Sequence, residues 1–353
     1  MVGKGMRAGP AARIFGLAAT YVGTVVGAGF ASGQEIWTFF VRFGWAGFFG
    51  LALSGALFAL AGLRALALGA CFGPRATQFQ ALAAIAGSWA PLLDLVLLVF
   101  LIVLSGVMLA GAGAMAGQYS GPAWVGILLT ASLALLVIRA DVPGLTAANE
   151  VVVPILVLAT ISLALASLGA PGTSRPGTYP PSWGWPLAAL LYASYNTALA
   201  LPVLSAMGAA EVDAAVRRAG ALWGAFGLFF VGGLVAASLL RQPDLAARSE
   251  VPMAAIAGRI AKPFAWLYGA VLWAELFTTL VADSYGAAVR LGQLFGGSRT
   301  LWAGITMILG MLLSRLGFAR LVRTAYPAFG LVSLVILAGL IAPGPRREEG
   351  AGS

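Results

Sequence analysis

The sequence predicts an all-α integral membrane protein of about ten transmembrane helices, arranged as two inverted halves of five helices each. Composition is the first reason, because 60% of the 353 residues are hydrophobic and only 9% are charged, whereas a soluble domain carries about 25% charged residues. The second reason is that the apolar residues occur in runs of the length that a bilayer-spanning helix needs, roughly 20 residues. Polar or Gly/Pro-rich breaks separate these runs, and the breaks divide them evenly about the middle of the chain.

The apolar runs are the expected transmembrane helices. They lie at residues 12–42, 44–63, 88–118, 121–139, 143–169, 184–206, 217–240, 264–292, 299–315 and 320–342. Between them, residues 74–87 and 207–216 are expected to be short connectors. Residues 243–262 are polar and weakly amphipathic, so we expect a loop at the membrane interface there.

A stretch rich in proline and glycine at residues 170–183 separates the first five runs from the last five. We therefore expect a first five-helix repeat at residues 1–169, a linker at 170–183, a second repeat at 184–342 and a polar C-terminal tail at 343–353. Because each half crosses the membrane an odd number of times, the second half enters from the opposite side. A fold shared by the halves would then be an inverted repeat.

The charge distribution indicates how the chain sits in the membrane. The net charge is +9, and the Lys and Arg residues stand singly near the ends of the spans, which is typical of anchoring at the cytoplasmic face and not of nucleic-acid binding. We expect a multi-pass protein of the cell inner (plasma) membrane with both termini in the cytoplasm. Its expected partners are the lipid bilayer and a small-molecule substrate, and the sequence leaves protein partners undetermined.

The residue inventory argues against an enzyme. The chain has no histidine, and its lone cysteine, Cys71, excludes an internal disulfide and a cysteine-based metal site. It also lacks a nucleophile elbow, a metal-ligand cluster and a nucleotide-binding motif. We therefore expect no cofactor other than a coupling ion, Na⁺ or H⁺.

The first span is expected to be broken near its middle. Residues 23–35 (GTVVGAGFASGQE) contain four glycines within eleven residues, and each weakens a helix by about 1 kcal/mol relative to alanine. Small residues also serve close helix packing, but packing does not require the polar Gln34 and Glu35 at membrane depth. Unwound backbone in a membrane is tolerated only beside a cavity, where its freed N–H and C=O groups can bind ions. We therefore expect residues 26–33 to be non-helical.

A second break is expected at the corresponding place in the second half. Residues 192–202 (YASYNTALALP) combine a polar cluster with a proline, which predicts a non-helical segment at residues 194–200. The two breaks should face each other near the midplane. The side chains of Tyr195, Asn196 and Thr197 would then line a pocket for the substrate.

The stretch VGTVVGAGFASGQEIWTFF resembles the signature of the YkvI-type bacterial membrane proteins, which are placed in the amino acid–polyamine–organocation (APC) superfamily with the leucine-transporter (LeuT-like) fold. The resemblance covers the whole plan of ten helices, with the first and sixth broken. It implies that the backbone amides of Gly27, Ala28 and Gly29 receive a substrate carboxylate. It also implies that the carbonyls of Gly23 and Val26 ligate a sodium ion beside the eighth helix.

The eighth span, which the same resemblance assigns to the ion site, carries both hydroxyl and carboxyl groups. Thr279 and Ser284 match the expected hydroxyl ligands of sodium, but Asp283 is an additional carboxylate. Ionisable groups at membrane depth usually face a cavity or a partner, and burial favours the protonated form of a carboxylate. Glu150 and Asp283 are therefore the candidate proton carriers, and the choice between Na⁺ and H⁺ stays open.

Two further carboxylates, Glu35 and Glu275, lie deeper in their spans and are candidates for a gate. Taken together, the pattern favours a secondary transporter of a small organic solute, such as an amino acid or a similar zwitterion, that works by alternating access. The alternative is a membrane nutrient sensor, because the subunits of spore germination receptors resemble the same fold. A channel is a third interpretation, although paired broken helices suit a gated binding site better.

Overall fold

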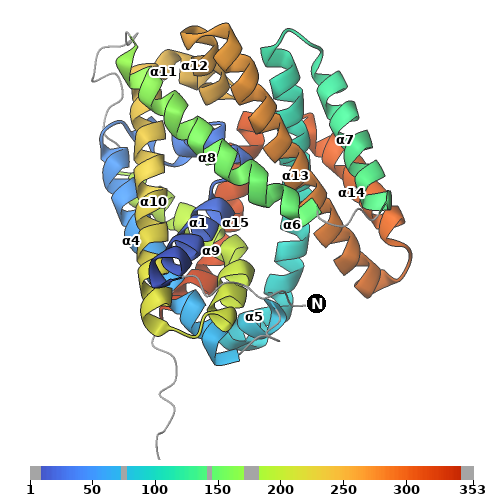
Figure 1. The fold of residues 1–353 in the computed structure, drawn as a ribbon. Coiled ribbons are helices and arrows are strands. Elements are labelled where there is room, and N and C mark those ends of the chain that lie inside the picture. The colour runs from blue at the N-terminus through green and yellow to red at the C-terminus, as the bar shows by residue number, and fades with distance from the viewer. Residues whose placement is uncertain (1–8, 73–77, 141–144, 171–182, 343–353) are drawn as a thin grey trace, which may run out of the picture.

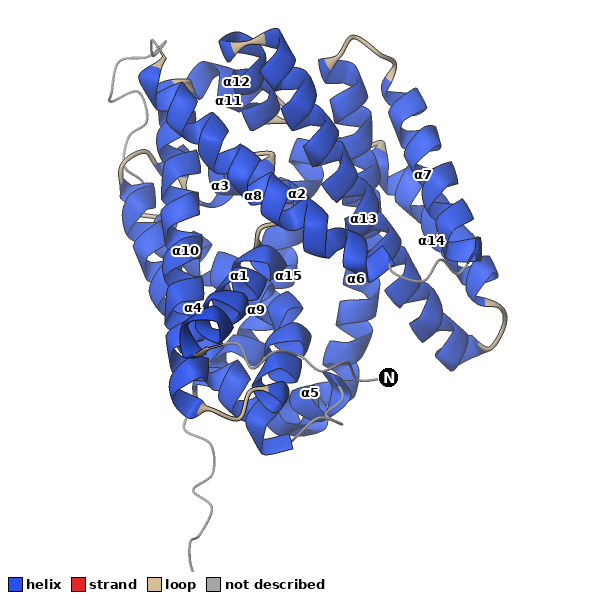
Figure 2. Cartoon of the chain, viewed as in Figure 1, coloured by secondary structure: helices blue, strands red, loops and turns tan. Residues whose placement is uncertain are grey.

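The protein is a bundle of helices joined by short turns (Figure 1). The structure, a computed structural model, describes residues 9–72, 78–140, 145–170 and 183–342, without the side chains of residues 78–79 and 145–150. Within these ranges there is no strand (Figure 2). The helices are α1 (Pro10–Val25), α2 (Ala28–Ala31), α3 (Gln34–Phe39), α4 (Ala46–Phe72), α5 (Gln78–Ala86), α6 (Ala90–Gln118), α7 (Ala123–Ala140), α8 (Leu145–Gly169), α9 (Trp185–Ala210), α10 (Ala214–Arg241), α11 (Pro243–Arg248), α12 (Pro252–Ile260), α13 (Lys262–Phe295), α14 (Arg299–Ser314) and α15 (Phe318–Ile341), with two 3₁₀ turns at Val41–Phe43 and Gly87–Trp89.

The predicted membrane crossings are confirmed. Eight helices of the described chain are long and apolar enough to cross a bilayer, and α14 is a shorter apolar helix. The short helices α1, α2 and α3 follow one another and together make the first crossing. The expected linker and C-terminal tail lie almost wholly outside the described residues.

Three connecting segments differ from the sequence prediction. The connector at residues 74–87 contains the helix α5, and α9 continues to Ala210, into the connector predicted at 207–216. The loop predicted at 243–262 is instead the pair of short helices α11 and α12. Both of these helices begin with a proline, whose fixed φ favours the first turn of a helix.

The two halves of the chain make the same pattern of helix contacts. Each crossing of the first half corresponds to the crossing five places later, so that α1 corresponds to α9, and α4 corresponds to α10. The contact of α1 with α10 corresponds to that of α9 with α4, and the contact of α6 with α14 corresponds to that of α13 with α7. The contacts of α15 with α4 and α6 likewise correspond to those of α8 with α10 and α13. In Figure 1, α8 runs diagonally between α10 and α13. This exchange of partners is what two inverted five-helix halves require.

Glycines allow the sixth crossing to lie directly against the second. A Cβ on Gly69 of α4 would lie 1.8 Å from the carbonyl oxygen of Ser205, and a Cβ on Gly208 of α9 would lie 2.0 Å from that of Leu66. Both contacts are with backbone, which cannot move aside as a flexible side chain can. Small residues at such crossings let the two backbones pack closely within a membrane. This contact sets the position of α9, which carries one side of the site.

The prediction that the sixth crossing is broken is wrong. Helix α9 is continuous through residues 194–200. The amide nitrogen of Asn196 donates to the carbonyl oxygen of Tyr192 at 3.0 Å, so this polar side chain is satisfied by its own helix. The hydroxyl of Ser194 donates to the carbonyl oxygen of Gly330 in α15 at 2.5 Å. Because these groups find partners without unwinding the backbone, the polar cluster does not break the helix.

Candidate functional site

The first crossing is interrupted twice within the predicted segment 26–33. Val26 leaves the helical region, with φ −81° and ψ 83°, and Gly27 is extended. The single turn α2 follows, and Gly33 then adopts φ +83° before α3 begins, a conformation that favours glycine. The predicted break is therefore confirmed at its two ends, whereas residues 28–31, which were also predicted to be non-helical, form one helical turn.

The break leaves backbone groups without partners. Among the described residues, the N–H groups of Ala28, Gly29 and Phe30 donate no hydrogen bond. Likewise, the carbonyl oxygens of Gly23 and Val26 receive no hydrogen bond in the described part of the chain. Unpaired donors and acceptors inside a membrane protein are expensive unless a ligand or water meets them. Of the predicted groups, the N–H groups of Ala28 and Gly29 and the carbonyls of Gly23 and Val26 are thus unpaired in the described part of the chain. The N–H of Gly27 instead donates to the carbonyl oxygen of Val25 at 3.0 Å, and the roles of all these groups remain predictions.

The far end of the break, towards α11 and α12, is held closed by hydrogen bonds. The N–H of Met253 in α12 donates to the carbonyl oxygen of Ser32 at 2.9 Å. The hydroxyl of Tyr268 in α13 donates to the carbonyl oxygen of Ala31 at 2.5 Å. Gly27, at the other end of α2, is not fully buried. The segment is therefore sealed on the α11–α12 side and more open on the side of α1.

Glu35 links the broken first crossing to the sixth. Its Oε2 accepts a hydrogen bond of 2.6 Å from the hydroxyl of Tyr195 in α9, and its carboxylate lies against Gly29, where an added Cβ would be 2.0 Å from Oε1. The ring of Tyr195 packs against Phe39 and Tyr326, with centroids 5.7 and 5.1 Å apart. Glu35 is only 5% exposed. The carboxylate predicted as part of a gate is thus a fixed link between the two halves.

A second carboxylate approaches the break from α13. Glu275 is 3% exposed, and its Oε1 lies 4.0 Å from the position of a Cβ on Gly27. The same oxygen accepts a hydrogen bond of 3.3 Å from the hydroxyl of Thr279, whereas Oε2 is buried with no partner. Asp283 lies eight residues after Glu275, on the same face of the helix at 3.6 residues per turn, and its Oδ2 is also buried without a partner.

Not all of the other residues predicted for the site lie beside the break in the first crossing. Ser284 lies on the opposite side of α13 from Glu275, and its hydroxyl is 3.0 Å from that of Ser105 in α6, so it does not meet the α1 carbonyls. Thr197 is buried in α9, and its hydroxyl has no partner. The side chain of Glu150 lies outside the described residues.

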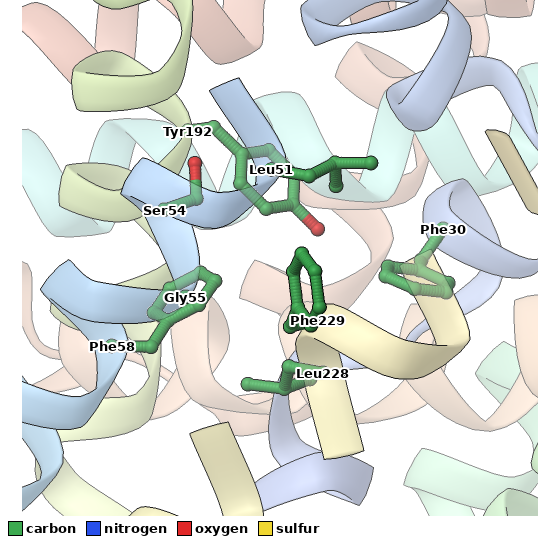
Figure 3. Close-up of a pocket in the computed structure, with 8 residues that line it drawn as sticks. All are labelled: Phe30, Leu51, Ser54, Gly55, Phe58, Tyr192, Leu228 and Phe229. Atoms are coloured by element: carbon green, nitrogen blue, oxygen red, sulfur yellow. The ribbon is translucent and has the colours of Figure 1, made fainter. Parts of the chain in front are cut away.

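A small hollow lies between α2, α4, α9 and α10 (Figure 3). Its volume is about 10 Å³, which is room for about one water molecule. The hydroxyl of Tyr192 points towards the middle of the hollow in Figure 3, and it has no hydrogen-bond partner. The lining residues are Phe30, Leu51, Ser54, Gly55, Phe58, Tyr192, Leu228 and Phe229. The hollow is too small and too apolar to receive an organic solute.

Sequence reasoning missed several residues that hold the site. Tyr268 donates to the Ala31 carbonyl from the eighth crossing, and the ring of Tyr326 packs against Tyr195 from the tenth. Near the start of the first crossing, Arg13 forms an ion pair of 2.8 Å with Glu211, in the connector between α9 and α10. These partners lie far apart along the chain, so no local pattern indicates them.

Comparison with solved structures defines the class of fold. The chain superposes on the inward-facing conformation of Mhp1 with a TM-score of 0.69 at 15% identity, covering 93% of this chain and 75% of Mhp1. It superposes on a variant of the manganese transporter of Eremococcus coleocola with a TM-score of 0.64 at 14% identity, covering 96% of this chain and 80% of that transporter. These similarities confirm a LeuT-like fold, the predicted fold of the APC superfamily.

Comparison with known sequences shows the family. The chain is 32% identical over 338 residues to the membrane protein YkvI of Bacillus subtilis, covering 94% of this chain and 97% of YkvI. It is 26% identical over 329 residues to the protein YyaD of the same organism, covering 91% of this chain and 94% of YyaD. The chain matches no family model. It belongs to the YkvI family of membrane proteins.

Proposed function

We propose that the protein is a secondary transporter that moves a small organic solute, such as an amino acid or a similar zwitterion, across the inner membrane by alternating access. Both termini would lie in the cytoplasm. The substrate would bind at the interrupted first crossing, between α9 and α13. The manganese transporter that shares the fold supports transport as the general activity.

One observation carries the proposal. The turn α2 combines unpaired N–H groups at its start with the buried carboxylates of Glu35 and Glu275 beside it. Each unpaired polar group at this depth lowers the stability of the fold, because it has lost its hydrogen bonds to water and gained none from the protein. A protein with no ligand to bind would gain nothing from such an arrangement. A polar solute that binds there would supply the missing partners. The closed α11–α12 end and the partly open α1 end fit the inward-facing step of a transport cycle.

For the coupling ion, we propose H⁺. Ser284 is turned towards α6, and the Thr279 hydroxyl already donates to Glu275, so few hydroxyl oxygens are left for a sodium ion next to Gly23 and Val26. Asp283 is buried and has an oxygen without a partner, so it can serve as a proton carrier. Glu150 is the second candidate carrier.

The test is uptake into proteoliposomes with an imposed pH gradient and no sodium, using a panel of radiolabelled amino acids and amines. Gly27→Leu is the blocking variant, because a Cβ at this position meets nothing closer than 4.0 Å, and the larger side chain fills the space beside Glu275. Gly16→Leu is the matched control, because Gly16 of α1 has nothing within 4 Å of an added Cβ. We expect uptake in the parent and the control, and loss of uptake in Gly27→Leu while the protein stays monodisperse.

Two results would contradict the proposal. Uptake by Gly27→Leu at the rate of the parent would show that the substrate does not bind at the break. Solute binding without uptake under either a pH gradient or a sodium gradient would favour the nutrient sensor instead. Uptake that follows a sodium gradient and ignores the pH gradient would preserve the transporter and refute proton coupling.

A further inference from the structure

The buried ionisable side chains of the described residues, tyrosines apart, are all acids. In the part of the chain that the structure describes, the buried charged side chains are Glu35, Glu275 and Asp283, and no Lys or Arg is buried. The described ion pairs lie elsewhere, where Arg13 meets Glu211 and Asp213 and Arg290 meets Asp94. The described interior of the bundle therefore carries acidic groups with no buried Lys or Arg to pair with them.

Two of these carboxylates reach the same helical turn. Glu35 lies against Gly29 from α3, and Glu275 approaches Gly27 from α13, so the two acids flank α2. Glu35 has a phenol donor, Tyr195. Among the described side chains, Glu275 has only the weak 3.3 Å contact from Thr279, and its second oxygen is buried with no partner there. The Glu275 carboxylate therefore reaches the break with Oε1 and keeps Oε2 buried without a partner in the described part of the chain, so a ligand cation beside Gly27 can bind it.

The charge balance decides between classes of ligand. A zwitterion would bring its own carboxylate next to two acids, and only the N–H groups at the start of α2 would favour that charge. Because α2 has four residues, the aligned peptide dipoles that favour an anion at a helix start are few. An ammonium group without a neighbouring carboxylate meets both acids with no such repulsion.

The surroundings favour an organic cation over a metal ion. Behind Glu35 lie the rings of Tyr195, Tyr192, Phe39 and Tyr326, with neighbouring centroids 5.1–5.7 Å apart. Aromatic rings attract ammonium groups and also pack against the alkyl part of an amine. In contrast, the described residues contain no group of three or more His, Cys, Asp or Glu side chains that could hold a metal.

We infer that the substrate is an organic amine with a net positive charge, whose ammonium group is held between Glu275 and Glu35 beside the turn α2. The inference rests on the proposed transport function and narrows its substrate class from amino acids to amines that lack a carboxylate. Glu275 and Thr279 would bind the ammonium group from one side. Glu35, fixed by Tyr195, would bind it from the other side and place the organic part against the aromatic rings.

The test uses sets of three probes that differ only in their charged groups. One set is phenethylamine, phenylalanine and 3-phenylpropionate, and a second is 3-methylbutylamine, leucine and 4-methylpentanoate. Binding to the purified full-length protein is measured by isothermal titration calorimetry, with NaCl alone and MnCl₂ alone as further probes. We expect an amine to bind at least about tenfold more tightly than its amino acid, and the anion not to bind.

Variants assign the binding to the two acids. Glu275→Gln and Glu35→Gln keep the size of the side chain and remove its charge, and each should weaken amine binding about 10- to 100-fold, the range expected for a hydrogen bond to a charged group. Asp244→Asn is the matched control, because Asp244 is exposed on α11, and it should leave amine binding unchanged. If Glu275→Gln does not fold, Glu35→Gln and Thr279→Val carry the test.

The outcomes separate this inference from the proposed function. Tighter binding of the amino acids, failure of every amine to bind, or Mn²⁺ or Na⁺ binding that depends on Glu275 and exceeds that of the amines would overturn the inference. If proteoliposomes take up an amino acid whose amine does not bind, transport stands and the inference fails. If amines bind through Glu275 but are never taken up, the transport proposal fails and the cation site stands.

Discussion

Replacing Gly29 with alanine tests the contact between the broken helix and Glu35. The new Cβ would lie 2.0 Å from Oε1 of Glu35 and 2.9 Å from its Cδ, so the carboxylate must move away. That movement breaks the 2.6 Å hydrogen bond from Tyr195, which costs about 1–3 kcal/mol for a buried pair of this kind. The loss of chain entropy in the unfolded state offsets about 0.4–1 kcal/mol. We therefore expect Gly29→Ala to lower the free energy of unfolding by about 1–2 kcal/mol.

Gly27→Ala is the matched control, two residues earlier in the same segment. A Cβ there meets only Oε1 of Glu275, at 4.0 Å, which is an ordinary contact. We expect its stability to equal that of the parent or to exceed it slightly. The assay is the apparent unfolding temperature in detergent, where about 1 kcal/mol corresponds to roughly 2–4 °C.

A double-mutant cycle identifies the cause of the loss. If the collision with Glu35 is responsible, Gly29→Ala should cost nothing further in a Glu35→Ala background. Equal unfolding temperatures for Gly29→Ala and Gly27→Ala would refute the packing described here. An undiminished cost in the Glu35→Ala background would place the strain elsewhere.

Three other variants test separate parts of the structure. Tyr268→Phe removes the donor to the Ala31 carbonyl and should lower the free energy of unfolding by about 1–3 kcal/mol; an unchanged unfolding temperature would contradict the closed α11–α12 end. Asp283→Asn should abolish uptake driven by a pH gradient while changing solute affinity by less than about twofold, and a parallel loss of affinity would place Asp283 in the substrate site instead. Arg13→Ala removes a partly exposed ion pair with Glu211, so it should cost less than about 1 kcal/mol and the cost should shrink further in high salt; a larger, salt-independent loss would contradict this assignment.

The first break shows what a local pattern can predict. Glycines at positions 23, 27, 29 and 33 weaken the helix wherever it lies, so the sequence indicates the interruption without knowledge of its neighbours. The sixth crossing has polar residues and a proline, yet it stays helical because Ser194 finds an acceptor in α15 and Asn196 finds one in its own helix. Whether the polar groups of such a segment find partners depends on which helices pack beside it.

The partners of the carboxylates could not be predicted for the same reason. Glu35 and Tyr195 are 160 residues apart, and no spacing within either helix indicates that they meet. Ser284 and Thr279 look equivalent as hydroxyl residues of one span, but they lie on different faces of α13, and only Thr279 faces Glu275. Which residues of a span face the site therefore depends on how each helix is rotated about its axis, and the sequence does not give that rotation.

The sequence by itself determined the membrane class, the ten crossings and the interruption of the first, because hydrophobic run length and glycine content act locally on the chain. Tertiary structure alone decided that the sixth crossing is continuous, that Glu35 is tied to Tyr195, and that Glu275 reaches the break with an oxygen unpaired. These features depend on side chains that come together from distant crossings. Which groups pair and which stay unpaired depends on how the crossings pack together, and the order of residues along the chain does not record those contacts.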